Sequence, residues 1–103
     1  MLVTFNSNVA GELMMFAEVA RRLLTVAGKE CTARGVILAD QVPDIIVRLR
    51  AAAAADKAEH GPDDEEDPNV VGLGRRAQPF IEFLELTARE KDGFVLWEAA
   101  RDF

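Results

Sequence analysis

The chain begins and ends with short runs of residues that favour strands, and helical patterns fill the space between them. Leu2 to Phe5 is the first run, and the polar cluster Asn6 to Asn8 that follows it is typical of a turn or a helix start. Phe94 to Trp97 is the last run. Because two strands of this length are marginal as an isolated sheet, we expect them to pair with each other and to be covered by helices on one face.

The segment from Val9 to Ala27 has apolar residues at helical spacing, which predicts the first helix. Gly28 is well placed to end it, because glycine reaches left-handed backbone angles without strain. The apolar surface extends beyond one stripe, so the helix is either central in the fold or covered by a partner. The main stripe is Leu13, Phe16, Ala17, Ala20, Leu23, Leu24 and Ala27, the second row is Met15, Val19 and Val26, and the polar side is Glu12, Glu18, Arg21, Arg22 and Thr25.

A second helix follows a loop over residues 29–35. Asp40 is the expected N-cap and Pro43 then lies in the first turn, where its missing N–H costs nothing. The alanines from Ala51 to Ala55 extend the helix on propensity alone. Val36 to Leu38, just before it, is a candidate third strand, but a run of three residues is too short to identify a strand.

Residues 56–72 are predicted to form an acidic, flexible linker between the second and third helices. The segment holds two prolines, seven acidic residues and one basic residue, so it accounts for the whole formal net charge of −6. The rest of the chain is charge-balanced and shows no basic stripe. Since a nucleic-acid binder needs such a stripe to neutralise phosphates, we expect no nucleic-acid partner.

The helical pattern resumes at Val70, and Pro79 either starts the third helix or kinks it after a short first turn. Phe80, Ile81, Leu84 and Ala88 form its core stripe, and Asp92-Gly93 ends it. Together the elements predict a single α+β domain over residues 1–103. Its small sheet has two or three short strands, with the terminal strands paired, and three helices cover it.

The single cysteine, Cys31, cannot form an internal disulfide, which fits a reducing compartment. The first residues lack the basic and long apolar regions of a signal peptide, and no apolar run approaches the length that spans a bilayer. We therefore expect a cytoplasmic protein with no membrane partner.

Several short blocks, taken in order, resemble a small proteobacterial family catalogued as domain of unknown function 1840. The resemblance covers nearly the whole chain except the acidic linker, and it implies a short, stand-alone, cytoplasmic bacterial protein. It brings no assigned activity and no catalytic residues. The blocks are Met1–Ser7, Met15–Ala20 with Leu23–Leu24, Gly35–Pro43, and Arg76–Leu84 with Val95–Glu98.

The residues that most often carry chemistry stand in unfavourable places. His60, the only histidine, lies in the acidic linker, where nothing would orient it as a base. Cys31 has Glu30 beside it, which opposes the positive charge that a reactive thiolate needs. The acidic run Asp63 to Asp67 lacks the ligand spacing of a calcium loop. We expect no catalytic residue, no metal site and no cofactor.

The best small-ligand candidate is the segment Gly72 to Arg76. Its Gly-Leu-Gly sequence followed by Arg75 and Arg76 is compatible with anion binding near a helix start. The dinucleotide fingerprint would need a third glycine and a preceding long strand. The alternative is a flexible re-entry into the fold with two surface arginines.

The function we expect is that of a non-enzymatic interaction module that associates with itself as a homodimer. The surplus of apolar residues on the first helix and the free edges of a short sheet favour it. The second reading is a regulator that binds a small ligand or anion through Gly72 to Arg76, with Arg34 as an additional candidate contact, and an enzyme comes third. Candidate interface residues are Met15, Val19, Phe83, Leu86 and Trp97.

Overall fold

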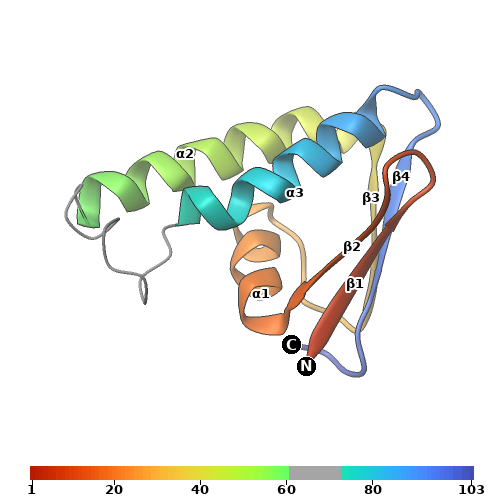
Figure 1. The fold of residues 1–103 in the computed structure, drawn as a ribbon, viewed down its shortest axis with the longest axis horizontal. Helices are drawn as coiled ribbons and strands as arrows, with labels where there is room; N and C mark the ends of the chain where they lie inside the picture. Colours follow the sequence, from red (N-terminus) through yellow and green to blue (C-terminus); the bar gives the residue numbers. More distant parts are fainter. Residues whose placement is uncertain (61–72) are drawn as a thin grey trace.

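The computed structural model describes residues 1–60 and 73–103, which form a four-stranded antiparallel sheet with three helices packed on one face (Figure 1). The sheet order is β2-β1-β4-β3. A short 3-10 turn, η1 (Ala39–Gln41), joins the third strand of the chain to the long helix that follows it. The elements are β1 (Leu2–Ser7), β2 (Gly11–Phe16), α1 (Ala17–Val26), β3 (Arg34–Leu38), α2 (Val42–His60), α3 (Leu73–Ala88) and β4 (Phe94–Glu98).

The two terminal strands are neighbours, as the sequence predicts. β1 pairs with β4 in antiparallel register, with Phe5 opposite Trp97 and Ser7 opposite Val95. These are the two central strands of the sheet, and the side chains of Val3, Phe5, Val95 and Trp97 on their inner face are buried. The pairing of residues more than 85 positions apart therefore holds the centre of the fold.

The prediction of two or three strands is wrong by one or two, because the segment from Gly11 to Phe16 is a strand. Leu13 and Met15 are half-buried while Met14 and Phe16 are exposed, which is the two-residue alternation of a strand. The hydroxyl of Ser7 accepts the N–H groups of Val9 and Ala10 and so fixes a tight turn into β2. The helix that we expected from Val9 consequently begins only at Ala17.

This correction also removes the surplus of apolar residues from the first helix. Met15 belongs to β2 and packs its side chain against the core from the sheet. Over six residues, an apolar run fits the strand period and the helix period about equally well, and here the hairpin with β1 decides between them.

Other element boundaries follow the predicted signals. Gly28 has φ +80°, and its N–H bonds the carbonyl of Thr25 while the N–H of Lys29 bonds that of Leu24, which is the Schellman ending of α1. Val36 to Leu38 does form a strand, as part of β3. Pro43 lies in the first turn of α2, and Pro79 lies inside α3 rather than at its start.

Asp40 does not cap α2 directly, because it lies within η1. The side chain of Gln41 serves this junction instead. Its Oε1 accepts the backbone N–H of Leu38 at 3.0 Å and a bond from Nζ of Lys29 at 3.0 Å.

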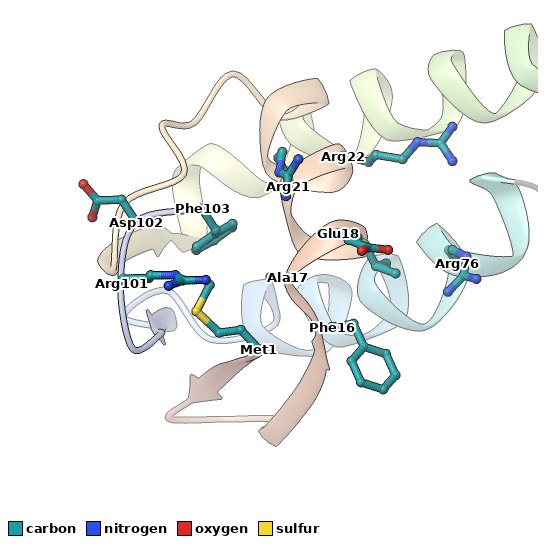
Figure 2. Close-up of a pocket in the computed structure, with 11 residues that line it drawn as sticks. Met1, Phe16, Ala17, Glu18, Arg21, Arg22, Arg76, Arg101, Asp102 and Phe103 are labelled. Atoms are coloured by element: carbon teal, nitrogen blue, oxygen red, sulfur yellow. The ribbon is translucent and has the colours of Figure 1, made fainter.

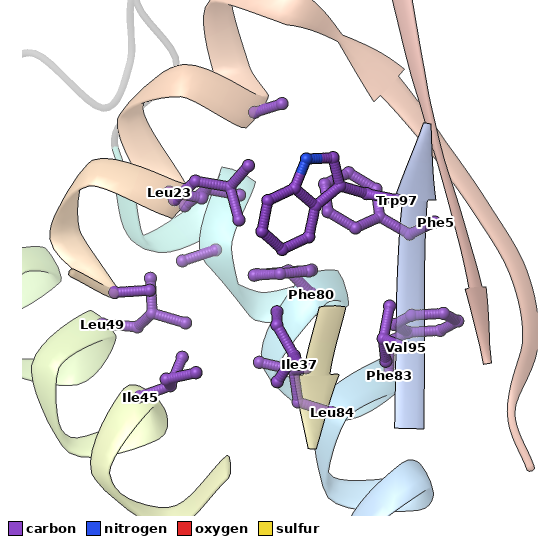
Figure 3. Packing of buried hydrophobic residues seen from close by; sticks show 14 of the residues in the cluster. Phe5, Leu23, Ile37, Ile45, Leu49, Phe80, Phe83, Leu84, Val95 and Trp97 are labelled. Atoms are coloured by element: carbon purple, nitrogen blue, oxygen red, sulfur yellow. The ribbon is translucent and has the colours of Figure 1, made fainter. Parts of the chain in front are cut away.

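The core lies between the inner face of the sheet and the three helices (Figure 3). Phe5 is at its centre, with the ring of Phe80 5.1 Å away in an edge-on contact and the indole of Trp97 6.4 Å away. Each helix contributes a fully buried leucine to the other side of the core: Leu23 from α1, Leu49 from α2 and Leu84 from α3. Helices α2 and α3 lie side by side (Figure 1).

The first five residues of the predicted acidic linker, 56–60, form the end of α2. Residues 61–72 lie outside the described part of the chain. Among the described residues, no helix combines the length and apolar character needed to cross a bilayer.

Candidate functional site

Two surfaces of the structure stand out, a groove lined by arginines and an apolar patch on the bare side of the sheet. The groove has a volume of about 740 Å³ and lies beside the start of α1 (Figure 2). Arginines reach it from three segments far apart in sequence, namely α1, α3 and the C-terminal residues. Its lining is Met1, Phe16, Ala17, Glu18, Val19, Arg21, Arg22, Arg76, Arg101, Asp102 and Phe103.

The groove is a positive region on an acidic chain. Four of the twelve Lys and Arg residues line it, against two carboxylates. One of these carboxylates, Asp102, is already engaged, because its Oδ1 accepts the backbone N–H of Ala33 at 2.8 Å. Within the described part of the chain, Arg21, Arg76 and Arg101 have no ion pair or side-chain hydrogen bond.

The fold positions these arginines through contacts that do not involve their side chains. The N–H of Phe103 bonds the carbonyl of Cys31 at 2.8 Å, and that of Ala99 bonds the carbonyl of Ala33 at 2.7 Å. These bonds hold the C-terminal residues, Arg101 included, against the loop that follows α1. The N–H of Ala17 bonds the carbonyl of Met1 at 2.9 Å, which fixes the start of α1 to the residue just before β1.

The structure separates the two arginines that the sequence singled out. Arg75 and Arg76 both lie exposed in the first turn of α3, but only Arg76 lines the groove. Gly72, the first residue of the predicted anion-binding segment, lies outside the described residues. Sequence reasoning missed Arg21 and Arg101, which the folded chain brings to the same groove from elements 80 residues apart.

The second surface is formed by cross-strand pairs on the side of the sheet opposite the helices. Val36 faces Leu96 across β3 and β4, and Leu38 faces Phe94. Val36, Leu38 and Leu96 are 41%, 46% and 49% exposed, and Phe94 is half-buried. We call these four residues the outer patch. No helix among the described residues covers it (Figure 1).

The edge of β3 beside this patch is protected at both ends. The N–H of Leu38 bonds the side chain of Gln41, and the carbonyl of Arg34 accepts the hydroxyl of Thr32 at 2.6 Å. Because these two backbone groups are already bonded, only a short part of the β3 edge remains on which another strand could pair. Natural sheets limit edge-to-edge association in this way. A partner would therefore contact the side chains of the outer patch on the face of the sheet, and would not add a strand at the edge of β3.

The five predicted interface residues lie in different environments. Phe83 and Trp97 are buried in the core of the single chain, and Met15 and Val19 are half-buried against it. Leu86, on α3, is 40% exposed. The residues of the outer patch were missed, although the alternation along Phe94 to Trp97 indicated that either Leu96 or Trp97 faces away from the helices.

Within residues 1–60 and 73–103, the other chemically active residue types show no organised site. Cys31 is half-buried, and its Sγ lies 3.8 Å from the hydroxyl of Thr25 and from the carbonyl of Arg21. The side chain of His60 and the acidic run Asp63 to Asp67 lie outside the described residues. Among the residues whose placement is known, no three His, Cys, Asp or Glu side chains gather in a way that could hold a metal ion.

Comparison with known families gives one match. The family model described as "Domain of unknown function (DUF1840)" matches residues 1–97. No curated protein and no solved structure shows a significant match to the chain.

Proposed function

Because the chain belongs to the family named domain of unknown function 1840, whose description gives no activity, we propose from its structure that the protein is a non-enzymatic interaction module that associates with itself through the outer patch. The observation that carries this proposal is the pairing of Val36 with Leu96 and of Leu38 with Phe94 on a sheet face that no described helix covers. Adjacent exposed apolar residues of this kind mark interaction surfaces more often than single ones do.

A second copy of the chain is the partner that the charges favour. The four residues of the patch are uncharged, and Arg34 and Glu98, which lie beyond it along β3 and β4, offset each other in an ion pair at 3.2 Å. A neutral, apolar surface is compatible with itself across a two-fold axis, since the same residues then meet on both sides. A strongly charged patch would repel its own copy.

The size of the patch makes the association weak. Four side chains, each about half exposed, gain roughly 1 kcal/mol each per copy on burial. That gain is comparable with the association cost of about 4–15 kcal/mol. The eight side chains of two copies gain about 8 kcal/mol in all, which exceeds the lowest association cost by about 4 kcal/mol. We therefore expect a dissociation constant on the order of 1 millimolar, in the range of transient contacts rather than permanent dimers.

Salt supplies a direct test of this interface. Each chain carries a net charge of −6, so two copies repel each other and screening should strengthen the dimer. Sedimentation velocity between about 20 micromolar and 1 millimolar, at low and at high ionic strength, measures this. A mass that stays monomeric over the whole range would rule the proposal out.

Two matched variants locate the interface. Leu96→Lys places a charge in the outer patch and should shift the protein to the monomer. Val47→Lys is the control, because Val47 is 66% exposed on α2, on the helix side of the sheet. A dimer that survives Leu96→Lys but not Val47→Lys would assign the contact to the helices instead.

The second candidate function is binding of a small anion by a regulatory protein. The observation that favours it is the position of Arg76, which lines the groove together with Arg21 and Arg101. Thermal unfolding in the presence of phosphate tests it, because a ligand that binds only the folded state raises the melting temperature. No shift at millimolar phosphate in any buffer would remove this candidate.

A further inference from the structure

We propose that the groove at the start of α1 binds a phosphorylated organic anion with a flat apolar part, a class that a nucleoside diphosphate represents. This inference deepens the second candidate function above and rests on it, and it does not depend on self-association. It names the ligand class and the residues that recognise each part of the ligand.

Unpaired guanidinium groups carry the argument for a polyanion. Arg21, Arg76 and Arg101 face one groove from three segments, and within residues 1–60 and 73–103 none of them has a carboxylate partner. Arginine binds phosphate oxygens through two parallel N–H bonds, which makes it the preferred residue for such ligands. Three arginines distributed along one groove suit a ligand with two or more negative charges better than one with a single charge.

The start of α1 adds to this positive region. Phe16 occupies the N-cap position and makes no side-chain cap bond, so the first turn of the ten-residue helix opens toward the groove without a polar cap. The N–H of Ala17 is bonded to the carbonyl of Met1, and the next N–H groups of this turn, together with the helix dipole, favour negative charge at this end. Glu18 of the same turn is the one acidic side chain that competes with a ligand there.

Phenylalanine rings argue for an apolar part in the ligand. Phe16 is 66% exposed and Phe103 is half-buried, and both line the groove beside the arginines (Figure 2). An exposed aromatic ring offers a surface on which a flat apolar group of a ligand can stack, while the neighbouring cations bind its charged part. The volume of about 740 Å³ lies within the range that small-molecule sites occupy, and it exceeds what a bare phosphate needs.

Calorimetric titration with ADP and with inorganic pyrophosphate tests the proposal. It should be done on the full chain and on Leu96→Lys, so that loss of self-association is separated from loss of binding. We expect ADP to bind both proteins, more tightly than pyrophosphate does, and more weakly as salt is added. Absence of ADP binding at millimolar concentration would overturn the proposal whether or not the chain dimerises.

Neighbouring arginines provide the matched control. Arg76→Ala should weaken ADP binding about threefold to tenfold, while Arg75→Ala, one residue earlier on the same helix and outside the groove, should leave it unchanged. Equal losses in the two variants would indicate attraction by overall charge and would contradict a defined site.

Two further variants separate the parts of the ligand. Glu18→Gln removes the competing carboxylate and should tighten ADP binding about two- to fivefold. Phe16→Ala should weaken binding of ADP and leave that of pyrophosphate unchanged. If pyrophosphate binds as tightly as ADP, or if Phe16→Ala weakens both equally, the assignment of an organic phosphate is wrong.

Discussion

Gly35 lies directly under the indole of Trp97, its partner across β3 and β4. A Cβ atom at this position would overlap three ring atoms of the indole, Cζ2, Cη2 and Cε2. The indole is buried, and its Nε1 donates to the carbonyl of Thr32 at 2.9 Å, so it cannot swing aside without losing that bond. Because Gly35 has no side chain, the indole of Trp97 can lie flat on the sheet at this position.

Gly35→Ala should therefore destabilise the fold by about 2–4 kcal/mol, since overpacking a rigid contact forces the ring or the strand to move. Urea unfolding followed by fluorescence measures it, because Trp97 is the only tryptophan. Gly11→Ala is the control for backbone strain without a clash. Gly11 has φ +89° and open space around its missing side chain, so about 1–2 kcal/mol is expected. Equal costs at the two positions would contradict the clash.

Trp97→Phe should cost about 1–2 kcal/mol, because it leaves the carbonyl of Thr32 without its buried donor. The same change should loosen the loop before β3, which the C-terminal residues also contact. Amide hydrogen exchange measures both effects. Faster exchange confined to β4, with the loop over residues 29–33 unchanged, would show that the indole bond does not hold the loop.

Thr87 links α3 to the hairpin of β1 and β2. Its side chain is fully buried, and it donates to the carbonyl of Phe83 at 2.9 Å. Each hydroxyl has one proton, so the 2.7 Å bond to Ser7 must have Ser7 as donor. The oxygen of Ser7 then accepts the N–H groups of the turn.

Thr87→Val keeps the shape of this buried side chain and should cost about 1–2 kcal/mol. Ser7→Ala should cost a similar amount and should also loosen the turn over residues 8–10. Because the two hydroxyls share a bond, a double-mutant cycle should give a coupling of about 1 kcal/mol. Additive losses would show that the two hydroxyls stabilise the fold independently.

Local signals in the sequence located most of the fold. The strand character of Leu2 to Phe5 and Phe94 to Trp97, the glycine at the end of α1 and the apolar stripes of α2 and α3 each depend on residues close together in the chain. The misread segment, Gly11 to Phe16, is where local signals conflict. Its leucine and methionines tolerate a helix, and only the turn held by Ser7 and the pairing with β1 make it a strand.

The candidate surfaces were harder to predict for the same reason. Arg76 stood out through the glycines before it, whereas Arg21 resembled any residue on the polar side of a helix. What brings Arg21 and Arg101 together is the path of the chain after β4, where Ala99 and Phe103 bond the loop over residues 31–33. The outer patch depends in turn on which face of each strand the helices cover, and this follows from the register between strands.

Gly28 offers a test of the ending of α1, which positions the loop that holds the C-terminal residues. With φ +80° it is in the left-handed region, where asparagine is tolerated and alanine is strained. Gly28→Ala should cost about 1–2 kcal/mol and Gly28→Asn less than about 1 kcal/mol. Among the described residues, the heavy atoms near an added Cβ belong to the exposed guanidinium of Arg48, which can move. Thermal and urea unfolding of both variants measure the difference. If asparagine proves as destabilising as alanine, space rather than backbone angle limits this position, and Arg48→Ala should then rescue both.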